Sequence, residues 1–478
     1  MCYRTFGLLL AVVLLAPARP AAGQGAAATP FVVTRRSLDV RVDYEQGSVA
    51  GTETLQLLNA GKKAISSVPL LLNRLMRVAS VAGPTGKAMP FRQTVVLFDD
   101  DSLLQVNSAV VTLPHPIARG DSATLVVRFG GRLVGYTETG SLYIQDHVDT
   151  AFTIIREDAY AFPVLGVPSR LLNRAHGYPA FSFSARVTVP VGFVAATGGE
   201  QLPAERRNSL VTWRYQSTMP SPALNIAVAR YRVIDRPGLR VFYFPADSAG
   251  AQMIDRAVAG AMTQFAAWFG PIGANAGLTV IEIPEGWGSQ ASLAGGIIQT
   301  ADAFRDRAQL PQLYHELSHL WNVVDLDQPS PRWNEGLAMF LQYRIAAQLD
   351  GWSNWDARLD RSQQIIQRVC QGAVPCASVP FADYGKRELT DLSYSVGFAM
   401  FDALYTAIGA PAFDSAYRDF YQRYRTAGAS GADLQAAFHR ANPASDRIFS
   451  EWYLTTGWYA RLNGGASLRA IVNGYPHQ

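Results

Sequence analysis

Charged residues, cysteine and clusters of basic side chains are all scarce in this sequence. Asp, Glu, Lys and Arg make up 17% of the 478 residues, against about 25% in average proteins. The net charge of +4 is spread thinly, and pairs such as Arg35-Arg36 and Arg206-Arg207 stand alone. No basic surface is indicated, so no nucleic-acid partner is predicted. With 49% hydrophobic residues, a chain of this length is expected to bury two or three domain cores.

Long apolar runs are scarce as well, and the clearest one lies at the N-terminus. Arg4 precedes the apolar stretch Gly7–Ala16, and small residues follow at Ala21–Gly23. This order is typical of a cleaved secretory signal. The apolar stretch is shorter than the roughly 20 residues of a membrane-spanning helix, and no later segment looks long and apolar enough to span. We predict a signal peptide over residues 1–23 and a secreted or periplasmic mature chain.

Only three cysteines are present, and two of them, Cys370 and Cys376, lie beyond the predicted signal. In an exported protein, two cysteines at this spacing favour a small disulfide loop. Two free buried thiols are the alternative. Metal binding by these cysteines is disfavoured, because two thiols alone do not complete a site.

Residues 31 to about 235 show short runs in which apolar and polar residues alternate. A period of two, broken by Gly, Pro and Asn, is typical of antiparallel strands that bury one face. The sequence predicts an antiparallel β-sandwich over residues 24–235, with a boundary at the turn-forming stretch Asp235–Gly238. The clearest alternating runs are at 37–43, 52–58, 123–129 and 181–189.

The pattern changes after this boundary. A β-rich run at 239–244 is followed by helical spacing from 251 to 269 and by a second β-rich run at 278–283. Beyond Glu335 the spacing is helical to near the C-terminus, with start signals at Ser430 and Ser445 and stop signals at Gly409 and Gly428. Residues 236–478 are therefore predicted to form an α/β domain that ends in helices. The whole chain is then a multidomain α+β protein.

One short motif carries a specific chemistry. His315, Glu316 and His319 form an H-E-x-x-H pattern. Residues four apart lie on one helix face, about 40° from each other, so both imidazoles can reach one ion at about 2.1 Å. Glu316 is then close enough to act on a water held by that ion, as hydrolysis requires. The alternative is a chance match in an exposed helix, with all three side chains solvated.

Two imidazoles leave a catalytic zinc one protein ligand short. Glu335 is the best candidate for the third, because it opens a second apolar helix after the turn-forming stretch 328–331. Antiparallel packing of the two helices would return the first turn of the second helix to the metal. We predict one zinc ion bound by His315, His319 and Glu335, with a fourth position open. Asp325 is a candidate for orienting an imidazole, or for a loop or capping role.

These motifs resemble those of the gluzincin metallopeptidases of the aminopeptidase N / leukotriene A4 hydrolase family. The resemblance rests on His315–His319, on Trp333-Asn-Glu-Gly336, and on Tyr394-Ser-Val-Gly-Phe398, which is similar to the family's Tyr-x-x-Gly-Ala helix start. It implies that Glu316 is the general base and that Tyr394 hydrogen-bonds the oxyanion of the tetrahedral intermediate. A core aromatic is the other interpretation of Tyr394. The interval between His319 and Glu335 is shorter than is usual in the family.

The resemblance also implies an architecture, an N-terminal β-saddle followed by a thermolysin-like catalytic domain. The stretch Phe449–Gly457 is similar to the end of that catalytic domain, and the sequence stops soon afterwards. A short form without the large C-terminal helical domain is therefore expected. The activity implied is zinc-dependent hydrolysis of peptide bonds by an aminopeptidase-like enzyme that acts on peptides or proteins.

The substrate-binding stretch departs from the family pattern. Where the family carries a Gly-x-Met-Glu-Asn edge strand, this chain keeps Gly295 and Gly296 but has Ser292 near the place of the acid. An edge strand that binds a peptide backbone through Ser292, Gly295 and Gly296 is still predicted. The Glu that grips a free α-amine in the family is missing. The candidate replacements, which are otherwise ordinary loop carboxylates, are Glu157, Asp158 and Glu285.

Alternatives to an aminopeptidase therefore stay open. The same residues would serve an endopeptidase or a hydrolase of a non-peptide bond. A catalytically silent binding or assembly protein that keeps zinc as a structural element is a third alternative. The sequence indicates neither the oligomeric state nor the physiological substrate.

Overall fold

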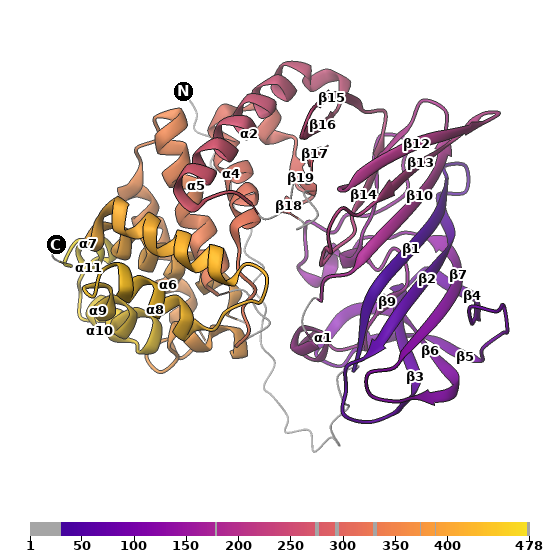
Figure 1. The fold of residues 1–478 in the computed structure, drawn as a ribbon, viewed down its shortest axis with the longest axis horizontal. Coiled ribbons are helices and arrows are strands. Elements are labelled where there is room, and N and C mark those ends of the chain that lie inside the picture. Colours follow the sequence, from indigo (N-terminus) through magenta and orange to yellow (C-terminus); the bar gives the residue numbers. More distant parts are fainter. Residues whose placement is uncertain are drawn as a thin grey trace. The chain divides into compact units, whose positions relative to one another are not determined.

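The computed structural model describes residues 30–176, 179–272, 277–291, 296–327, 332–372, 374–387 and 389–475. The predicted signal peptide, residues 1–23, lies outside them. The described residues form two compact units (Figure 1). The first contains the chain up to Tyr231 and the short segment Ile283–Gly288, and the second contains Arg232–Glu282 and the chain from Ser289 onward. Each unit is described by itself below.

The first unit is built from β-strands, as its alternating sequence predicts. Its largest sheet has the order β12-β13-β10-β1-β2-β7-β4. Along β1 the inward positions Leu38, Val40 and Val42 are buried and alternate with exposed residues. The strands of this sheet are β1 (Phe31–Asp43), β2 (Ser48–Asn59), β4 (Met76–Ala82), β7 (Ser122–Arg132), β10 (Ser182–Pro190), β12 (Glu200–Arg207) and β13 (Leu210–Gln216).

Two smaller sheets complete the first unit. One has the order β5-β6-β3-β9 and the other β11-β14-β8. Neighbouring strands are antiparallel except for one pair: β1 runs parallel to β10, with Leu38 opposite Ala185. That pairing joins residues far apart in sequence, which alternation alone does not reveal. The strands are β3 (Ile65–Asn73), β5 (Phe91–Phe98), β6 (Asp101–Ile117), β9 (Val164–Leu165), β8 (Thr153–Ile155), β11 (Val194–Ala196) and β14 (Ile226–Ala229), and the helix is α1 (Arg170–His176).

Charged side chains are buried inside the first unit. Arg36 occupies an inward position of β1 and pairs with Glu53 at 2.9 Å and with Glu157 at 3.0 Å. Arg156 and Asp146 form a second buried pair at 2.6 Å. Burial raises the pKa of Glu53 to about 8 although Arg36 opposes the shift. The Arg36 guanidinium is thus shared by the carboxylates of Glu53 and Glu157.

The second unit begins with a mixed sheet of order β15-β16-β17-β19-β18. Strands β16 and β17 run parallel, and helix α2 connects them, as the predicted strand, helix and strand require. Asp235, the predicted boundary residue, lies within β15, which pairs with β16. Strand β18 is the edge of the sheet and pairs antiparallel with β19. The elements are β15 (Arg232–Arg236), β16 (Leu239–Tyr243), α2 (Ser248–Phe269), β17 (Leu278–Ile283), β18 (Gln290–Ala291) and β19 (Gly296–Thr300).

Helices make up the rest of the second unit, as the spacing after Glu335 predicts. Helix α5 packs against both α4 and α7 (Figure 1), and buried aromatic residues such as Trp321, Trp333 and Phe401 fill the space among them. Helix α8 begins at the predicted Ser430, whose side chain forms a capping box with Asp433. The helices are α3 (Asp302–Arg305), α4 (Leu310–Ser318), α5 (Trp333–Asp350), α6 (Trp355–Cys370), α7 (Thr390–Tyr424), α8 (Gly431–Ala441), α9 (Ser445–Ile448), α10 (Gly457–Asn463) and α11 (Leu468–Val472).

Helix α7 is longer and more apolar than the sequence analysis anticipated. By length and composition its stretch Leu392–Tyr424 could cross a membrane, and no other helix in the described ranges passes that test. Of its most apolar window, 67% is buried inside the protein, as is typical of a core helix. The expectation that no later segment is long and apolar enough was therefore wrong, because core and membrane helices share both properties. The predicted stop Gly409 adopts φ 76° and ψ 160°, so it does end a helical stretch, and α7 consists of two helical parts that meet at this kink.

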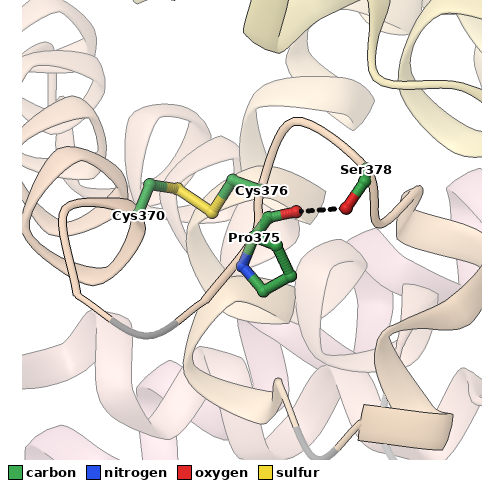
Figure 2. The surroundings of a disulfide bond; sticks show 4 residues. All are labelled: Cys370, Pro375, Cys376 and Ser378. Carbon is green, nitrogen blue, oxygen red and sulfur yellow. Dashed lines mark hydrogen bonds between the residues drawn. A yellow bond between two sulfur atoms is a disulfide. The ribbon is translucent and has the colours of Figure 1, made fainter.

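The two late cysteines form a disulfide, as favoured from their spacing. Cys370 ends α6 and bonds Cys376, with the Cα atoms 5.5 Å apart. Figure 2 shows the bond beside a turn in which the Ser378 hydroxyl donates to the Pro375 carbonyl at 3.1 Å. The Thr456 hydroxyl donates to the carbonyl of Ala377. The disulfide thus closes a short loop that is also held to the C-terminal helices.

Candidate metal centre

The two histidines of the motif lie at the end of α4 and at the start of the 3-10 turn that follows it. Leu313 and Leu317 bury the opposite face of α4 in the core. The ring centroids of His315 and His319 are 4.8 Å apart, and the ring planes are nearly perpendicular at 87°. The helical spacing therefore places both imidazoles on one face, as predicted.

Glu335 meets both imidazoles from the first turn of α5. Its Oε2 atom lies 3.2 Å from His315 Nε2 and 3.7 Å from His319 Nε2. The candidate ligand atoms of the three residues all lie within 4.8 Å of one another. Ligands that surround a tetrahedral zinc at about 2.1 Å are separated by roughly 3.4 Å. Two imidazole nitrogens and one carboxylate oxygen at these separations fit a catalytic zinc.

The outer nitrogens of both imidazoles have partners that the sequence analysis did not identify. The Nδ1 atom of His315 lies 3.0 Å from Gln342 Oε1, and Nδ1 of His319 lies 2.8 Å from the Asn322 side-chain amide. The Gln342 oxygen is an acceptor, so it keeps the proton on His315 Nδ1 and leaves Nε2 of that ring free for a metal. Gln342 follows Glu335 by two helical turns, a spacing on one face that could have indicated it. Asp325, considered for such a role, pairs with Arg332.

A close contact between two glycines brings α7 to the metal group. A Cβ on Gly336 would lie 2.5 Å from the Cα of Gly397, so neither position accepts a side chain without displacing a helix. The contact places Tyr394 beside the site, with its ring 6.0 Å from that of His315 and nearly parallel to it. The Tyr394 hydroxyl hydrogen-bonds Glu335. The structure thus brings the predicted tyrosine to the predicted ligands.

The two glutamates of the site titrate differently. Burial raises the pKa of Glu316 to about 7, with the Glu335 charge adding to the shift and His319 opposing it. Glu335 is half-buried, and its desolvation also favours the protonated form, yet the charges of His319 and His315 and the Tyr394 hydrogen bond lower its pKa to about 2. These directions hold for the metal-free site. A ligand that stays ionised next to a carboxylate that can carry a proton is the combination that hydrolysis needs.

The edge strand of the sheet lies next to Glu316. The backbone N–H of Ala291, in β18, donates to the Glu316 carboxylate. Of the predicted substrate residues, Gly296 begins β19, whereas Ser292 and Gly295 lie outside the described residues. Of the candidate replacement acids, Glu157 is engaged with Arg36 in the first unit, Asp158 is half-buried and its charge interacts with Arg156, and Glu285 belongs to the segment counted with that unit.

Comparisons with known proteins agree on one family. The profile of the Peptidase family M1 domain matches residues 298–452, a range that contains the whole His-His-Glu group. No match was found among curated protein sequences. An M1 zinc metallopeptidase from Deinococcus radiodurans has a similar structure, with a TM-score of 0.61 and 19% identity over 94% of this chain and 95% of that chain.

Two further structures are similar over most of this chain. A mutant M1 zinc metallopeptidase from Deinococcus radiodurans bound to a Tyr-Ser-Ala substrate has a TM-score of 0.62 and 18% identity, covering 94% of this chain and 95% of that chain. Yeast LTA4 hydrolase in complex with bestatin has a TM-score of 0.63 and 15% identity, covering 91% of this chain and 71% of that chain. At these identities the likeness shows a shared multidomain fold.

Proposed function

Since this chain belongs to peptidase family M1, whose members hydrolyse peptide bonds with one catalytic zinc, we propose that it is an exported aminopeptidase acting on short peptides. The observation that carries the proposal is the arrangement in the second unit. His315, His319 and Glu335 form a zinc-compatible group, and Glu316 and Tyr394 both interact with Glu335.

We assign each side chain of the site a separate role. His315, His319 and Glu335 would hold one zinc ion, which would act as a Lewis acid toward water and the scissile carbonyl. Glu316 takes the proton of the attacking water and passes it to the leaving amine. The Tyr394 hydroxyl donates a hydrogen bond to the oxyanion of the tetrahedral intermediate. The hydrogen bond from Ala291 orients the Glu316 carboxylate.

The position of strand β18 favours a peptide as the substrate. It is the edge of its sheet, and an edge strand presents backbone groups with which an extended peptide can pair. A peptide bound along β18 would pass Glu316, since Ala291 contacts that carboxylate. Gly296 begins β19, the strand that pairs with β18. This placement supports hydrolysis of a peptide rather than of a non-peptide bond.

Cleavage at a free N-terminus is supported by similar structures. Two of them are two-domain M1 zinc metallopeptidase mutants bound to L-arginine and to L-tryptophan, and another is bound to the tripeptide Tyr-Ser-Ala. Free amino acids and short peptides are the expected products and substrates of an aminopeptidase. The second candidate function is endopeptidase activity, favoured by the absence of the Met-Glu-Asn segment around Ser292.

Export is supported by two features of the chain. The pattern of Arg4, an apolar stretch and small residues at 21–23 is that of a secretory signal. The disulfide between Cys370 and Cys376 is typical of proteins that fold in an oxidising compartment. We therefore propose a secreted or periplasmic location, which N-terminal sequencing of the protein recovered from the cell exterior would test. A retained N-terminal Met in the cytosol would contradict it.

The function is tested with a pool of free and N-acetylated peptides, incubated with and without a chelator and analysed by mass spectrometry. We expect chelator-sensitive trimming of the free N-termini only. Internal cuts that ignore acetylation would replace the aminopeptidase with the endopeptidase. Zinc binding without any cleavage would favour the alternative of a catalytically silent binding or assembly protein. Glu316→Gln, purified in parallel, controls for a contaminating peptidase.

A further inference from the structure

Arg332 immediately precedes the helix that carries Glu335, and its side chain is only 1% exposed. We propose that Arg332 is a positioning residue for the metal centre: it holds the first turn of α5, and thereby Glu335, to the segment that follows His319. The proposal rests on the zinc site assigned above. It does not depend on whether the substrate is cut at its N-terminus or internally.

The first turn of α5 needs such a support, because it has no side-chain cap. Arg332 itself occupies the N-cap position with φ −132° and ψ −99°, and its side chain, which has no acceptor atom, makes no capping hydrogen bond. Glu335 lies at the third helical position, where an acid often folds back to cap the helix. Here its carboxylate faces the two imidazoles instead. The ligand therefore sits in a turn that must be held by other contacts.

The guanidinium of Arg332 provides these contacts in several directions. Its Nε and Nη2 atoms each lie 2.6 Å from a different oxygen of Asp325, and Nη1 donates to the carbonyl of Ala382 at 2.7 Å. Its plane also lies over the Trp333 ring at 4.6 Å. A bidentate pair with additional donors requires the planar fork of arginine, which lysine lacks.

The partner of Arg332 belongs to a segment that is itself fixed. Val324 and Leu326, on either side of Asp325, exchange backbone hydrogen bonds with Ala429, each at 2.9 Å. The Asp327 carboxylate accepts from the N–H of Gly431 at the start of α8. Arg332 therefore connects the start of α5 to a rigid part of the unit.

A second bridge joins the same two stretches closer to the ligands. The Asn334 side-chain amide donates to the carbonyl of Val323 at 2.9 Å, and Val323 is buried. The chain that leaves His319 and the chain that enters Glu335 are thus linked by two side chains, Asn334 and Arg332. These bridges therefore set the separation of the second and third ligands.

The same helix offers a matched control. Arg344, farther along α5, is also buried, its Nη2 atom lies 2.8 Å from Asp414 Oδ2, and it stacks on Trp268 at 3.8 Å. This pair has the chemistry of Arg332–Asp325, but its partners lie on α2 and α7 and not in the metal group. A purely structural arginine on α5 should behave like Arg344.

The test compares Arg332→Gln with Arg344→Gln in the full chain. Zinc affinity is measured by competition with a chelator, on protein shown to be folded by circular dichroism. We expect Arg332→Gln to bind zinc about 10- to 100-fold more weakly, with kcat lowered more than KM is changed. Arg344→Gln should lower the unfolding temperature without weakening zinc binding. Arg332→Lys should fall between the parent and Arg332→Gln, because the charge remains while the fork is lost.

Unchanged zinc affinity in Arg332→Gln would overturn the proposal and leave Arg332 a structural residue like Arg344. If Arg332→Gln does not fold, Asp325→Asn takes its place, and zinc binding as tight as in the parent would contradict the proposal equally. Failure of the proposed aminopeptidase function is recognised separately. In that case the unaltered protein would bind zinc, the affinity loss in Arg332→Gln would persist, and only the cleavage pattern would differ.

Discussion

Arg36 in the first unit and Arg332 in the second are buried to the same extent, but the groups that surround the two guanidinium groups differ. Arg36 is shared by Glu53 and Glu157, and Oε2 of Glu53 has no hydrogen-bond partner among the described residues. Arg332 faces the paired oxygens of Asp325 and a backbone carbonyl. An excess of buried acid makes the first cluster sensitive to protonation. A fully engaged guanidinium makes the second a rigid geometric support.

The pKa values of the glutamates in the two units show a similar contrast. Burial dominates at Glu53 and raises its pKa to about 8. Glu335 is half-buried and desolvation acts on it in the same direction, but two histidines and Tyr394 lower its pKa to about 2. Burial disfavours the charged form at both positions, so the number and sign of the neighbours decide which form exists. Glu53 therefore holds a proton near neutral pH, whereas Glu335 stays ionised.

The largest expected effect is the loss of activity when the proposed general base, Glu316, is replaced. Glu316→Gln should lower kcat by about 10²- to 10⁴-fold, because the amide cannot accept the proton of water. Zinc affinity and unfolding temperature should stay near those of the unaltered protein, since the shape of the side chain is kept. Peptidase assays and metal analysis on the same sample check both statements. Full activity in this variant would refute the assigned mechanism.

The next effect concerns the first unit. Arg36→Met leaves Glu53 and Glu157 buried without a cation, and removing one partner of a buried pair costs about 3–5 kcal/mol. Urea unfolding measures the loss. Arg186→Met is the control, because Arg186 is 41% exposed and pairs with Asp39 and Glu205 on the surface, where such pairs contribute about 0–1 kcal/mol. Equal losses of unfolding free energy in the two variants would show that the buried ion pairs of Arg36 stabilise the protein no more than the surface pairs of Arg186 do.

The third prediction is a pH dependence of stability. The folded protein binds the Glu53 proton more tightly than the unfolded chain, since the pKa rises from 4.5 to about 8. This stabilisation is complete below pH 4.5 and is lost as the pH rises through about 8. We expect a decrease of at most a few kcal/mol over that range. Glu53→Gln should flatten the curve measured by urea unfolding, and an unchanged curve would assign the dependence to other groups.

The smallest effect should come from an outer partner of the metal ligands. Gln342→Leu removes the oxygen that faces His315 Nδ1 and should weaken zinc binding by about 10- to 100-fold. Gln312→Leu, on α4, is the control, because Gln312 bonds Gln309 and not the metal group. Chelator competition measures both. If the two variants bind zinc alike, Gln342 does not orient His315.

Much of the site follows from short-range pattern. The spacing of His315 and His319 on one helix, the Asn-Glu-Gly start of the next helix, and the separation of a β-rich half from a helical half are local properties that periodicity reveals. The family and the fold class inferred from them are confirmed by the M1 domain match and by the similar structures. The disulfide between Cys370 and Cys376 was likewise favoured from spacing and is present.

Other features depend on contacts between residues far apart in sequence. The parallel pairing of β1 with β10 and the close approach of Gly336 to Gly397 join segments that no local pattern links. The apolar character of α7 is the same for a core helix and a membrane helix, and only its burial distinguishes them. The sequence by itself thus determined which residues can bind zinc. The tertiary structure decided which of them meet and which partners hold them, because side-chain contacts depend on packing and not on periodicity.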